Sequence, residues 1–315
     1  MQVSKRDGKK EDFLVEKIHK VVMWATKDIN GVSFSDIEMN ANLSLYDGIS
    51  SVEIHKILIK SANDLISTSN PNYQYVAARL LNMELRKEVW GCGDSPVDFL
   101  VFLERNVDNG VYDSLILDRW SEEEVELFAK CINHDRDDLF TYAGLQQLID
   151  KYLVKNRSTG NIYETPQLAY MCIAMCLFET VEEVKKAYEC YSTFKINLPT
   201  PIMAGVRTNI RQFASCVLVD IDDNLDAIFS SIHAVGKYTA RRAGIGLNIG
   251  RMRPINSPIR GGEVIHTGLI PYLKNFESAV KSTSQNGLRG GSATVHIPFW
   301  HFEIEDVMVL KNNAG

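Results

Sequence analysis

The sequence lacks a long apolar run and any CxxC pair of cysteines. Its most apolar stretch, 170–178, is far shorter than the ~20 residues that a membrane-spanning helix needs. The first residues, MQVSKRDGKKEDF, are too polar for the core of a signal peptide. Six cysteines are scattered without a CxxC pair, which argues against a zinc ribbon and a disulfide framework. We therefore expect a protein of the reducing cytoplasm with no membrane as a partner.

Positive charge is also in deficit. Lysine and arginine number 34 against 40 aspartates and glutamates, so the formal net charge is −6. A chain with this balance has no global attraction for a polyanion, and we expect no nucleic acid among its partners. Any phosphate contact must come from lysines and arginines placed locally. The chain has 315 residues, 45% of them hydrophobic, which suits one large globular domain or two unequal ones.

Residues 1–91 have the pattern of a small domain. A polar turn, KRDG, separates the strand-like MQVSK from a stretch with helical spacing, which predicts a hairpin leading into a helix. Ser50 and Glu53 have the spacing of a capping box, and Asn70-Pro71 predicts an N-cap followed by a first-turn proline. The breaker GCGDSP then marks a boundary.

The pattern changes twice after this boundary. Residues 92–192 are mostly helical, with a hairpin predicted to turn at Thr159-Gly160. In 193–315, short apolar runs alternate with a helix-like stretch, 224–242, and with glycine-rich loops. Strand, helix and strand in that order imply parallel pairing, so we expect an α/β sheet or barrel here.

Two features of the pattern have both a chemical and a structural interpretation. The basic turn KRDGKK at 5–10 could neutralise a triphosphate, although on pattern alone a solvated charged turn is the simpler interpretation. Cys216 begins an apolar strand, where its thiol could act as a redox group at the end of a sheet. Composition by itself favours a buried structural cysteine at this position.

Three loops combine glycine with arginine: RRAGIG at 241–246, RGGE at 260–263 and SQNGLRGG at 284–291. Glycine allows close backbone approach to a ligand, and arginine donates to phosphates or base edges. None of the loops matches a Walker or Rossmann fingerprint, so ligand loops and plain turns stay equal alternatives. His296 and His301 do not have the spacing of ligands on one helix, and we expect no metal site.

Longer motifs point to a family. In order, the chain carries KRDG with EKIHKV, PNYQYVAARL, YLVKNRSTGNIYET, STFKINLPTPIMAGVRT, RQFASCVL, RRAGIGLNIGRMR, SPIRGGEVIHTG and SQNGLRGGSAT. Through them it resembles, over essentially all 315 residues, the N-terminal part of the large subunit of class I (aerobic) ribonucleotide reductase of bacterial and phage type. The resemblance implies an oxidoreductase that reduces ribonucleoside diphosphates to deoxyribonucleotides.

The resemblance also implies a fold with three parts. Residues 1–91 correspond to a helical ATP-cone, 92–192 to a helical region, and 193–315 to the first portion of a ten-stranded α/β barrel, which is incomplete here. In the family the ATP-cone senses ATP against dATP and sets overall activity. By position, the residues that hold this activity nucleotide are Lys5, Glu11, Lys17, Ser51, His55 and Lys87.

In the barrel region, the resemblance implies that Thr200, Ser215, Cys216 and Gly244 contact the substrate. Cys216 matches the reductant cysteine that forms a disulfide with a distant partner cysteine as each ribose is reduced. The resemblance therefore reverses the interpretation of Cys216 from structural to redox.

The specificity effector, a deoxynucleoside triphosphate or ATP, is expected at the dimer interface. The resemblance implies that it is held by Asp223, Asn224, Leu225, Arg253 and Arg260, and that a loop with Ser284, Gln285 and Arg289 relays its identity to the substrate. The chain departs from the family at Asn224, Thr283, Asn286 and Ser292. The resemblance implies that the chain dimerises through helix 224–242. Ile228, Ile232 and Val235 repeat there at helical spacing, although these residues could equally be core.

The family's thiyl-radical loop, its partner cysteine and its reducing tail are expected downstream of Gly315. We therefore expect a piece of a large subunit that works with a complementing C-terminal polypeptide, a small subunit with a di-iron or related radical cofactor, and thioredoxin or glutaredoxin. The alternative is a non-catalytic nucleotide sensor that keeps the ATP-cone. A cone-bearing transcriptional repressor is disfavoured because it would carry a four-cysteine zinc ribbon.

Overall fold

A computed structural model describes the chain in two compact units. Unit 1 comprises Met1–Leu198 with Arg207–Asn209, and unit 2 comprises Pro199–Val206 with Ile210–Gly315. The residues that the structure describes are 2–6, 8–42, 44–91, 95–156, 158–210, 213–241, 243–283 and 291–311. None of the helices in these ranges is long and apolar enough to cross a membrane.

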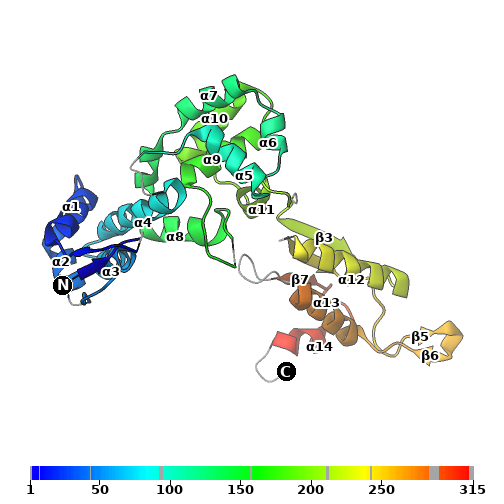
Figure 1. The fold of residues 1–315 in the computed structure, drawn as a ribbon. Coiled ribbons are helices and arrows are strands. Elements are labelled where there is room, and N and C mark those ends of the chain that lie inside the picture. The colour runs from blue at the N-terminus through cyan, green and yellow to red at the C-terminus, as the bar shows by residue number, and fades with distance from the viewer. Residues whose placement is uncertain are drawn as a thin grey trace. The chain divides into compact units, whose positions relative to one another are not determined.

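Unit 1 begins with the predicted hairpin, followed by four helices (Figure 1). Strands β1 and β2 pair antiparallel, with Val3 opposite Glu11. The helices pack around a core that includes Val22, Leu58 and Val76. The elements of this part are β1 (Gln2–Ser4), β2 (Lys10–Asp12), α1 (Val15–Thr26), α2 (Phe34–Asn42), α3 (Ser51–Asp64) and α4 (Tyr73–Trp90).

The helix starts in this part follow the predictions only partly. The Ser50 hydroxyl accepts a hydrogen bond from the Glu53 amide at 3.0 Å, as a capping residue should. In a capping box the Glu53 carboxylate would accept from the Ser50 amide. It accepts instead from the Tyr46 hydroxyl at 2.7 Å, so only half of the predicted capping box is present. The predicted start of α4 at Asn70-Pro71 is wrong, because these residues precede the helix, and its N-cap is Asn72. The side-chain Nδ2 of Asn72 donates to the Asn30 carbonyl at 2.9 Å, which ties the start of α4 to a preceding loop.

The remainder of unit 1 is helical, as predicted. Helix α9 is apolar on all sides and is buried along almost its whole length, which is typical of a central helix. The predicted hairpin is present as a bridge between Lys155 and Ile162, with Gly160 at φ +85° in the turn. The helices are α5 (Phe99–Asp108), α6 (Leu115–Asp118), α7 (Glu122–Cys131), η1 (His134–Leu139), α8 (Tyr142–Lys151), α9 (Pro166–Leu177) and α10 (Val181–Ser192).

Unit 2 contains the predicted parallel sheet, in the strand order β3-β4-β7. Both pairings are parallel, and Cys216 lies opposite Gly244 in the register of β3 and β4. Its elements are α11 (Thr200–Gly205), β3 (Cys216–Asp220), α12 (Leu225–Ala240), β4 (Gly244–Asn248), β5 (Pro258–Ile259), η2 (Arg260–Gly262), β6 (Val264–Ile265), α13 (Leu269–Thr283), β7 (Ala293–His296), α14 (Ile304–Met308) and η3 (Val309–Lys311). The α/β expectation is therefore confirmed for this part.

The core of unit 2 decides one alternative that the pattern left open. Ile228 and Val235 are almost fully buried in a cluster with Ile245 and Leu247 of β4. Their helical repeat therefore faces the chain's own sheet and is not a dimer surface. The side chains of α12 that face outward include Leu225 and Phe229, which are exposed.

Candidate functional site

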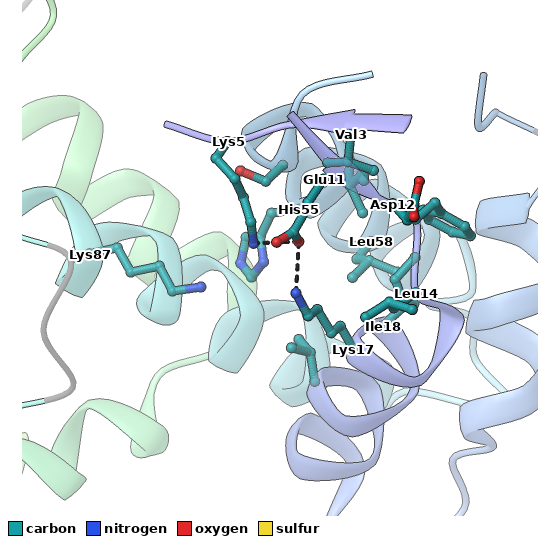
Figure 2. Close-up of a pocket in the computed structure, with 14 residues that line it drawn as sticks. Val3, Lys5, Glu11, Asp12, Leu14, Lys17, Ile18, His55, Leu58 and Lys87 are labelled. Carbon is teal, nitrogen blue, oxygen red and sulfur yellow. Dashed lines mark hydrogen bonds and ion pairs between the residues drawn. The ribbon is translucent and has the colours of Figure 1, made fainter. Parts of the chain in front are cut away.

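A cavity of about 230 Å³ in the ATP-cone region is lined by all six residues predicted for the activity nucleotide. They come from different elements: Lys5 follows β1, Glu11 lies on β2, Lys17 on α1, Ser51 and His55 on α3, and Lys87 on α4 (Figure 2). Apolar side chains complete the lining, among them Val3, Ile18, Ile54 and Leu58. An apolar wall beside cationic groups suits a ligand with a flat ring and a phosphate chain.

Glu11 organises the cationic side of this cavity. Its Oε1 atom lies 2.7 Å from Lys17 Nζ and 2.8 Å from Lys5 Nζ (Figure 2). The hydrogen bonds from Lys17 and then Lys5 lower the pKa of the Glu11 carboxyl. The carboxylate thus brings two ammonium groups together at the mouth of the pocket. Lys87 adds a third cation to the lining.

His55 is buried and supplies a different kind of contact. Its Nε2 atom lies 2.7 Å from the Leu80 carbonyl oxygen. Because a carbonyl can only accept, Nε2 carries the proton and Nδ1 keeps a lone pair. Burial lowers the pKa of His55, so the ring is neutral at pH 7. A neutral ring with an accepting nitrogen can recognise an N–H or O–H donor of a ligand.

Three of the four predicted substrate residues lie together at the amino ends of β3 and β4 in unit 2. Cys216 is the first residue of β3 and Gly244 the first of β4, and the Gly244 amide donates to the Ser215 carbonyl at 2.8 Å. The Cys216 side chain is exposed, whereas Gly244 is buried. The structure thus places this thiol in solvent at a sheet end. Thr200 is the first residue of another element, α11, and is half-buried.

Four of the five predicted effector residues follow the carboxyl ends of β3 and β4. Arg253 donates to Asp223 from its Nε atom at 2.7 Å and from its amide at 3.1 Å. Asn224 caps α12, because its Oδ1 accepts from the Ala227 amide at 2.8 Å, and Leu225 begins that helix. Arg260 is exposed and has φ +51° in η2.

The predicted specificity loop cannot be placed. Ser284, Gln285 and Arg289, with the departure at Asn286, lie outside the described residues. The flanking departures, Thr283 at the end of α13 and Ser292 before β7, are described. In the described ranges no group of three or more His, Cys, Asp and Glu side chains is arranged to hold a metal ion.

The sequence interpretation missed Arg251. Its guanidinium pairs with Asp220 and Asp222, each at 2.9 Å, and it lines a second cavity with Asn248, His296 and other residues. The sequence signal for this residue is RMR at 251–253, shortly after β4. Three aspartates, Asp220, Asp222 and Asp223, stand at the corresponding end of the neighbouring strand β3.

Three family models match the chain. They are described as the ATP cone domain, over residues 1–88, the all-alpha domain of ribonucleotide reductase, over 138–211, and the barrel domain of ribonucleotide reductase, over 214–315. Their order along the chain is the order of the cone-like part, the helical part and the parallel sheet. The fold and the family models therefore agree.

Curated relatives match the chain from end to end. Ribonucleoside-diphosphate reductase 1 subunit alpha of Escherichia coli (strain K12) is 49% identical over 99% of this chain, and the alpha subunit of Haemophilus influenzae is 48% identical over 100%. The alpha subunit of Enterobacteria phage T4 is 46% identical over 100%. The chain spans 42% of the length of each of these relatives. With its three matching domains in the same order, the chain belongs to the ribonucleotide reductase large-subunit family, of which it corresponds to the N-terminal part.

Proposed function

We propose that the chain works as the N-terminal part of a ribonucleoside-diphosphate reductase large subunit. In this role it carries a nucleotide-sensing cone, an effector site and one of the two cysteines that reduce the substrate. The observation that carries the proposal is the exposed thiol of Cys216 at the edge of a parallel sheet, beside Ser215 and Gly244.

At this edge, Cys216 and a second cysteine act as a dithiol. Their two sulfur atoms form a disulfide and supply two electrons and two protons, while the C2′–O bond of the ribose breaks and the oxygen leaves as water. Thioredoxin or glutaredoxin then reduces the disulfide, at a rate that depends on the thiolate fraction of the attacking thiol and on its access to the disulfide. Ser215, Thr200 and Gly244 hold the ribonucleoside diphosphate in place.

The second cysteine and the thiyl-radical residue come from a complementing C-terminal segment or polypeptide. A small subunit with a di-iron or related cofactor supplies the radical. The proposal includes a homodimer of the large subunit, and it places the protein in the cytoplasm, where these thiol reductants act.

The cone pocket holds ATP or dATP in this proposal. Lys5, Lys17 and Lys87 neutralise the phosphates, and Glu11 holds the first two lysines in position. The accepting Nδ1 of His55 faces an N–H or O–H donor of the nucleotide. At the sheet edge after β3, Asp223, Asn224, Leu225, Arg253 and Arg260 hold the specificity effector.

The experiment that tests the proposal is a reductase assay on the protein purified from its native source, with whatever polypeptides remain bound to it. Labelled CDP is supplied with ATP, a class I small subunit and a thioredoxin system. We expect formation of dCDP, and Cys216→Ser should abolish it. Cys131→Ser, on α7, is the matched control and should retain activity. Turnover that survives Cys216→Ser would contradict the proposal.

A second function is favoured by one observation. All six predicted nucleotide residues lie in a single cavity of the cone, which by itself suffices for a non-catalytic nucleotide sensor. The two functions separate genetically. If the biological role of the protein survives Cys216→Ser but is lost with Lys5→Ala, the sensor is correct. If Cys216→Ser abolishes that role, the reductase is correct.

A further inference from the structure

The loop between β4 and α13 carries both arginines of the proposed effector site. Arg253 lies near its start, and Arg260 lies in the small β5–β6 hairpin at its tip. Two backbone hydrogen bonds close the base of this hairpin. The Asn256 amide donates to the His266 carbonyl at 3.0 Å, and the His266 amide donates to the Ser257 carbonyl at 2.9 Å. The arginines can meet a triphosphate only if the ends of the loop are held.

One carboxylate holds both ends of the loop. Glu303, which follows β7, is 3% exposed. Its Oε2 atom accepts from the Ile255 amide at 2.8 Å, and its Oε1 atom accepts from the Leu269 amide at 3.0 Å. Leu269 is the first residue of α13, so the carboxylate also lies at the positive end of that helix. These bonds join the residues after Arg253 to the residues after the hairpin.

His301 extends the same clamp to the other side of Arg253. Its Nε2 atom lies 3.0 Å from the Met252 carbonyl, and its Nδ1 accepts from the Glu303 amide at 3.1 Å. Because Nδ1 accepts and a carbonyl cannot donate, Nε2 carries the proton, and the neutral tautomer satisfies both contacts. Arg253 is therefore bracketed by fixed contacts at Met252 and Ile255.

Gly268 makes room for the clamp. Its φ is +92°, and a Cβ atom at this position would lie 2.6 Å from Glu303 Oε1 and 3.2 Å from the Ile255 Cβ. Only glycine combines this backbone conformation with so close an approach of the carboxylate. The glycine, the carboxylate and the loop thus form one interlocking arrangement.

We propose that Glu303, seated by His301 and Gly268, is a positioning residue for the effector: it presents Arg253 and the Arg260 hairpin to the triphosphate. This inference rests on the proposed function. A loop that is already held in its binding conformation binds more tightly, because the ligand does not have to order it. The contribution of Glu303 is therefore to affinity for the effector, although it touches only backbone amides of the loop.

The test compares Glu303→Gln with a control, Glu305→Gln. Glu305 is exposed and lies two residues away, in α14. The Leu269 amide lies within hydrogen-bond distance of both carboxylate oxygens, at 3.0 and 3.2 Å, so the NH₂ group of a Gln side chain would face that amide in either orientation and place two donors together. Labelled dTTP binding to the full chain is measured by equilibrium dialysis, with circular dichroism to confirm folding. We expect E303Q to weaken dTTP binding about ten-fold and E305Q to change it less than about two-fold.

A double-mutant cycle separates positioning from general destabilisation. Gly268→Ala displaces the same carboxylate, so the E303Q/G268A chain should bind dTTP within about two-fold of E303Q alone. If the losses of dTTP affinity in E303Q and G268A add in full in the double variant, the two residues act independently and the clamp is overturned. Equal binding by E303Q and the unmutated chain would overturn it as well. If the unmutated chain binds no dTTP, the proposed effector site itself fails, and the inference fails with it.

Hydrogen exchange tests the inference without a variant, which matters if E303Q does not fold. In the unmutated chain, dTTP should slow exchange of the Ile255 and Leu269 amide hydrogens together, since both donate to Glu303. Exchange at these amides that does not respond to bound dTTP would contradict the proposal.

Discussion

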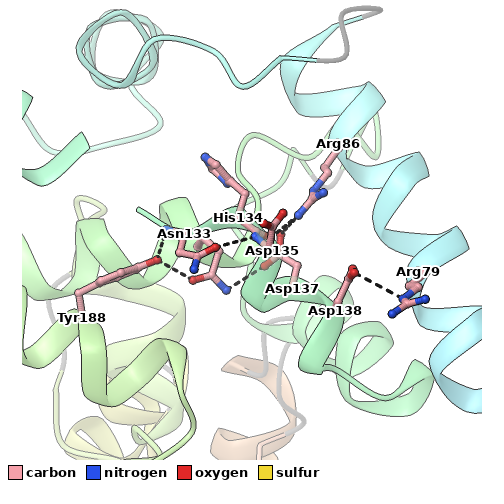
Figure 3. Close-up of polar contacts among 9 residues, drawn as sticks. Arg79, Arg86, Asn133, His134, Asp135, Asp137, Asp138 and Tyr188 are labelled. Atoms are coloured by element: carbon pink, nitrogen blue, oxygen red, sulfur yellow. Dashed lines mark hydrogen bonds and ion pairs between the residues drawn. The ribbon is translucent and has the colours of Figure 1, made fainter. Parts of the chain in front are cut away.

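Arg86 on α4 donates to the buried carboxylate of Asp137 in η1 at 3.2 Å, and this contact joins the cone to the helical part of unit 1 (Figure 3). The same guanidinium contacts the His134 carbonyl, and Gln167 donates to Asp137 at 2.9 Å. Helix α4 also carries Lys87 of the cone pocket. One helix therefore contributes both to the proposed nucleotide site and to this buried polar cluster.

Two neighbours in η1 should give opposite pH dependences of stability. Burial raises the pKa of Asp137 to about 6, although Arg86 and Gln167 oppose the rise. Its contribution to stability is therefore complete below the unfolded pKa and is lost as the pH rises through 6. Burial and then the charge of Arg86 lower the pKa of His134 to about 4. Its contribution is complete above pH 6.5 and is lost as the pH falls toward 4.

We predict that Asp137→Asn makes the free energy of unfolding rise more steeply than in the unmutated chain between pH 4 and 6.5, by about 2 kcal/mol over that range. His134→Gln should shift the slope by about the same amount in the opposite direction. Urea unfolding at several pH values measures both. Asp108→Asn, an exposed change at the end of α5, is the control. Parallel pH profiles for all four chains would contradict the prediction.

Arg207 and Glu164 form a fully buried ion pair in unit 1, with two contacts between guanidinium and carboxylate. Arg207→Met should destabilise unit 1 by about 3–5 kcal/mol, because it leaves a buried carboxylate without its cation. The double variant Glu164→Gln/Arg207→Met should recover part of this loss, since Gln can still accept from the Val154 amide. Urea unfolding of both variants checks the order, and a double variant less stable than the single one contradicts it.

Cysteine labelling should separate Cys216 from Cys172. Cys216 is exposed, whereas Cys172 is fully buried and its pKa is raised by burial. Brief treatment of the folded chain with iodoacetamide, followed by peptide mass spectrometry, should modify Cys216 at least about ten times faster than Cys172. In urea the two rates should converge. Equal rates in the folded chain would show that the thiol of Cys216 is not accessible.

The side chain of Asn224 caps α12. Asn224→Ala removes that acceptor and should lower the stability of unit 2 by about 1 kcal/mol. Asn224→Ser restores a capping hydroxyl and should stay within about 0.5 kcal/mol of the unmutated chain. Thermal unfolding of the three chains measures the effect. If the alanine and serine variants are equally stable, the cap does not contribute.

Local pattern was sufficient for several elements. The apolar run at Cys216 predicted β3, the KRDG turn predicted the hairpin, and Ser50 predicted the start of α3. These signals depend on neighbours within a few residues, so they need no knowledge of the fold. The predicted start at Asn70-Pro71 was wrong: the Asn70 amide donates to the Ser67 hydroxyl in a preceding turn, and the N-cap is Asn72.

The sequence by itself determined the family, the order of its parts and which residues to seek in the cone. Only the tertiary structure decided that Ile228 and Val235 face the chain's own sheet, because a helical repeat marks a buried face without saying what covers it. The same holds for Glu11 and Glu303, whose roles depend on partners from distant segments. The sequence does not show which donors a carboxylate will contact, because folding brings those donors from distant segments.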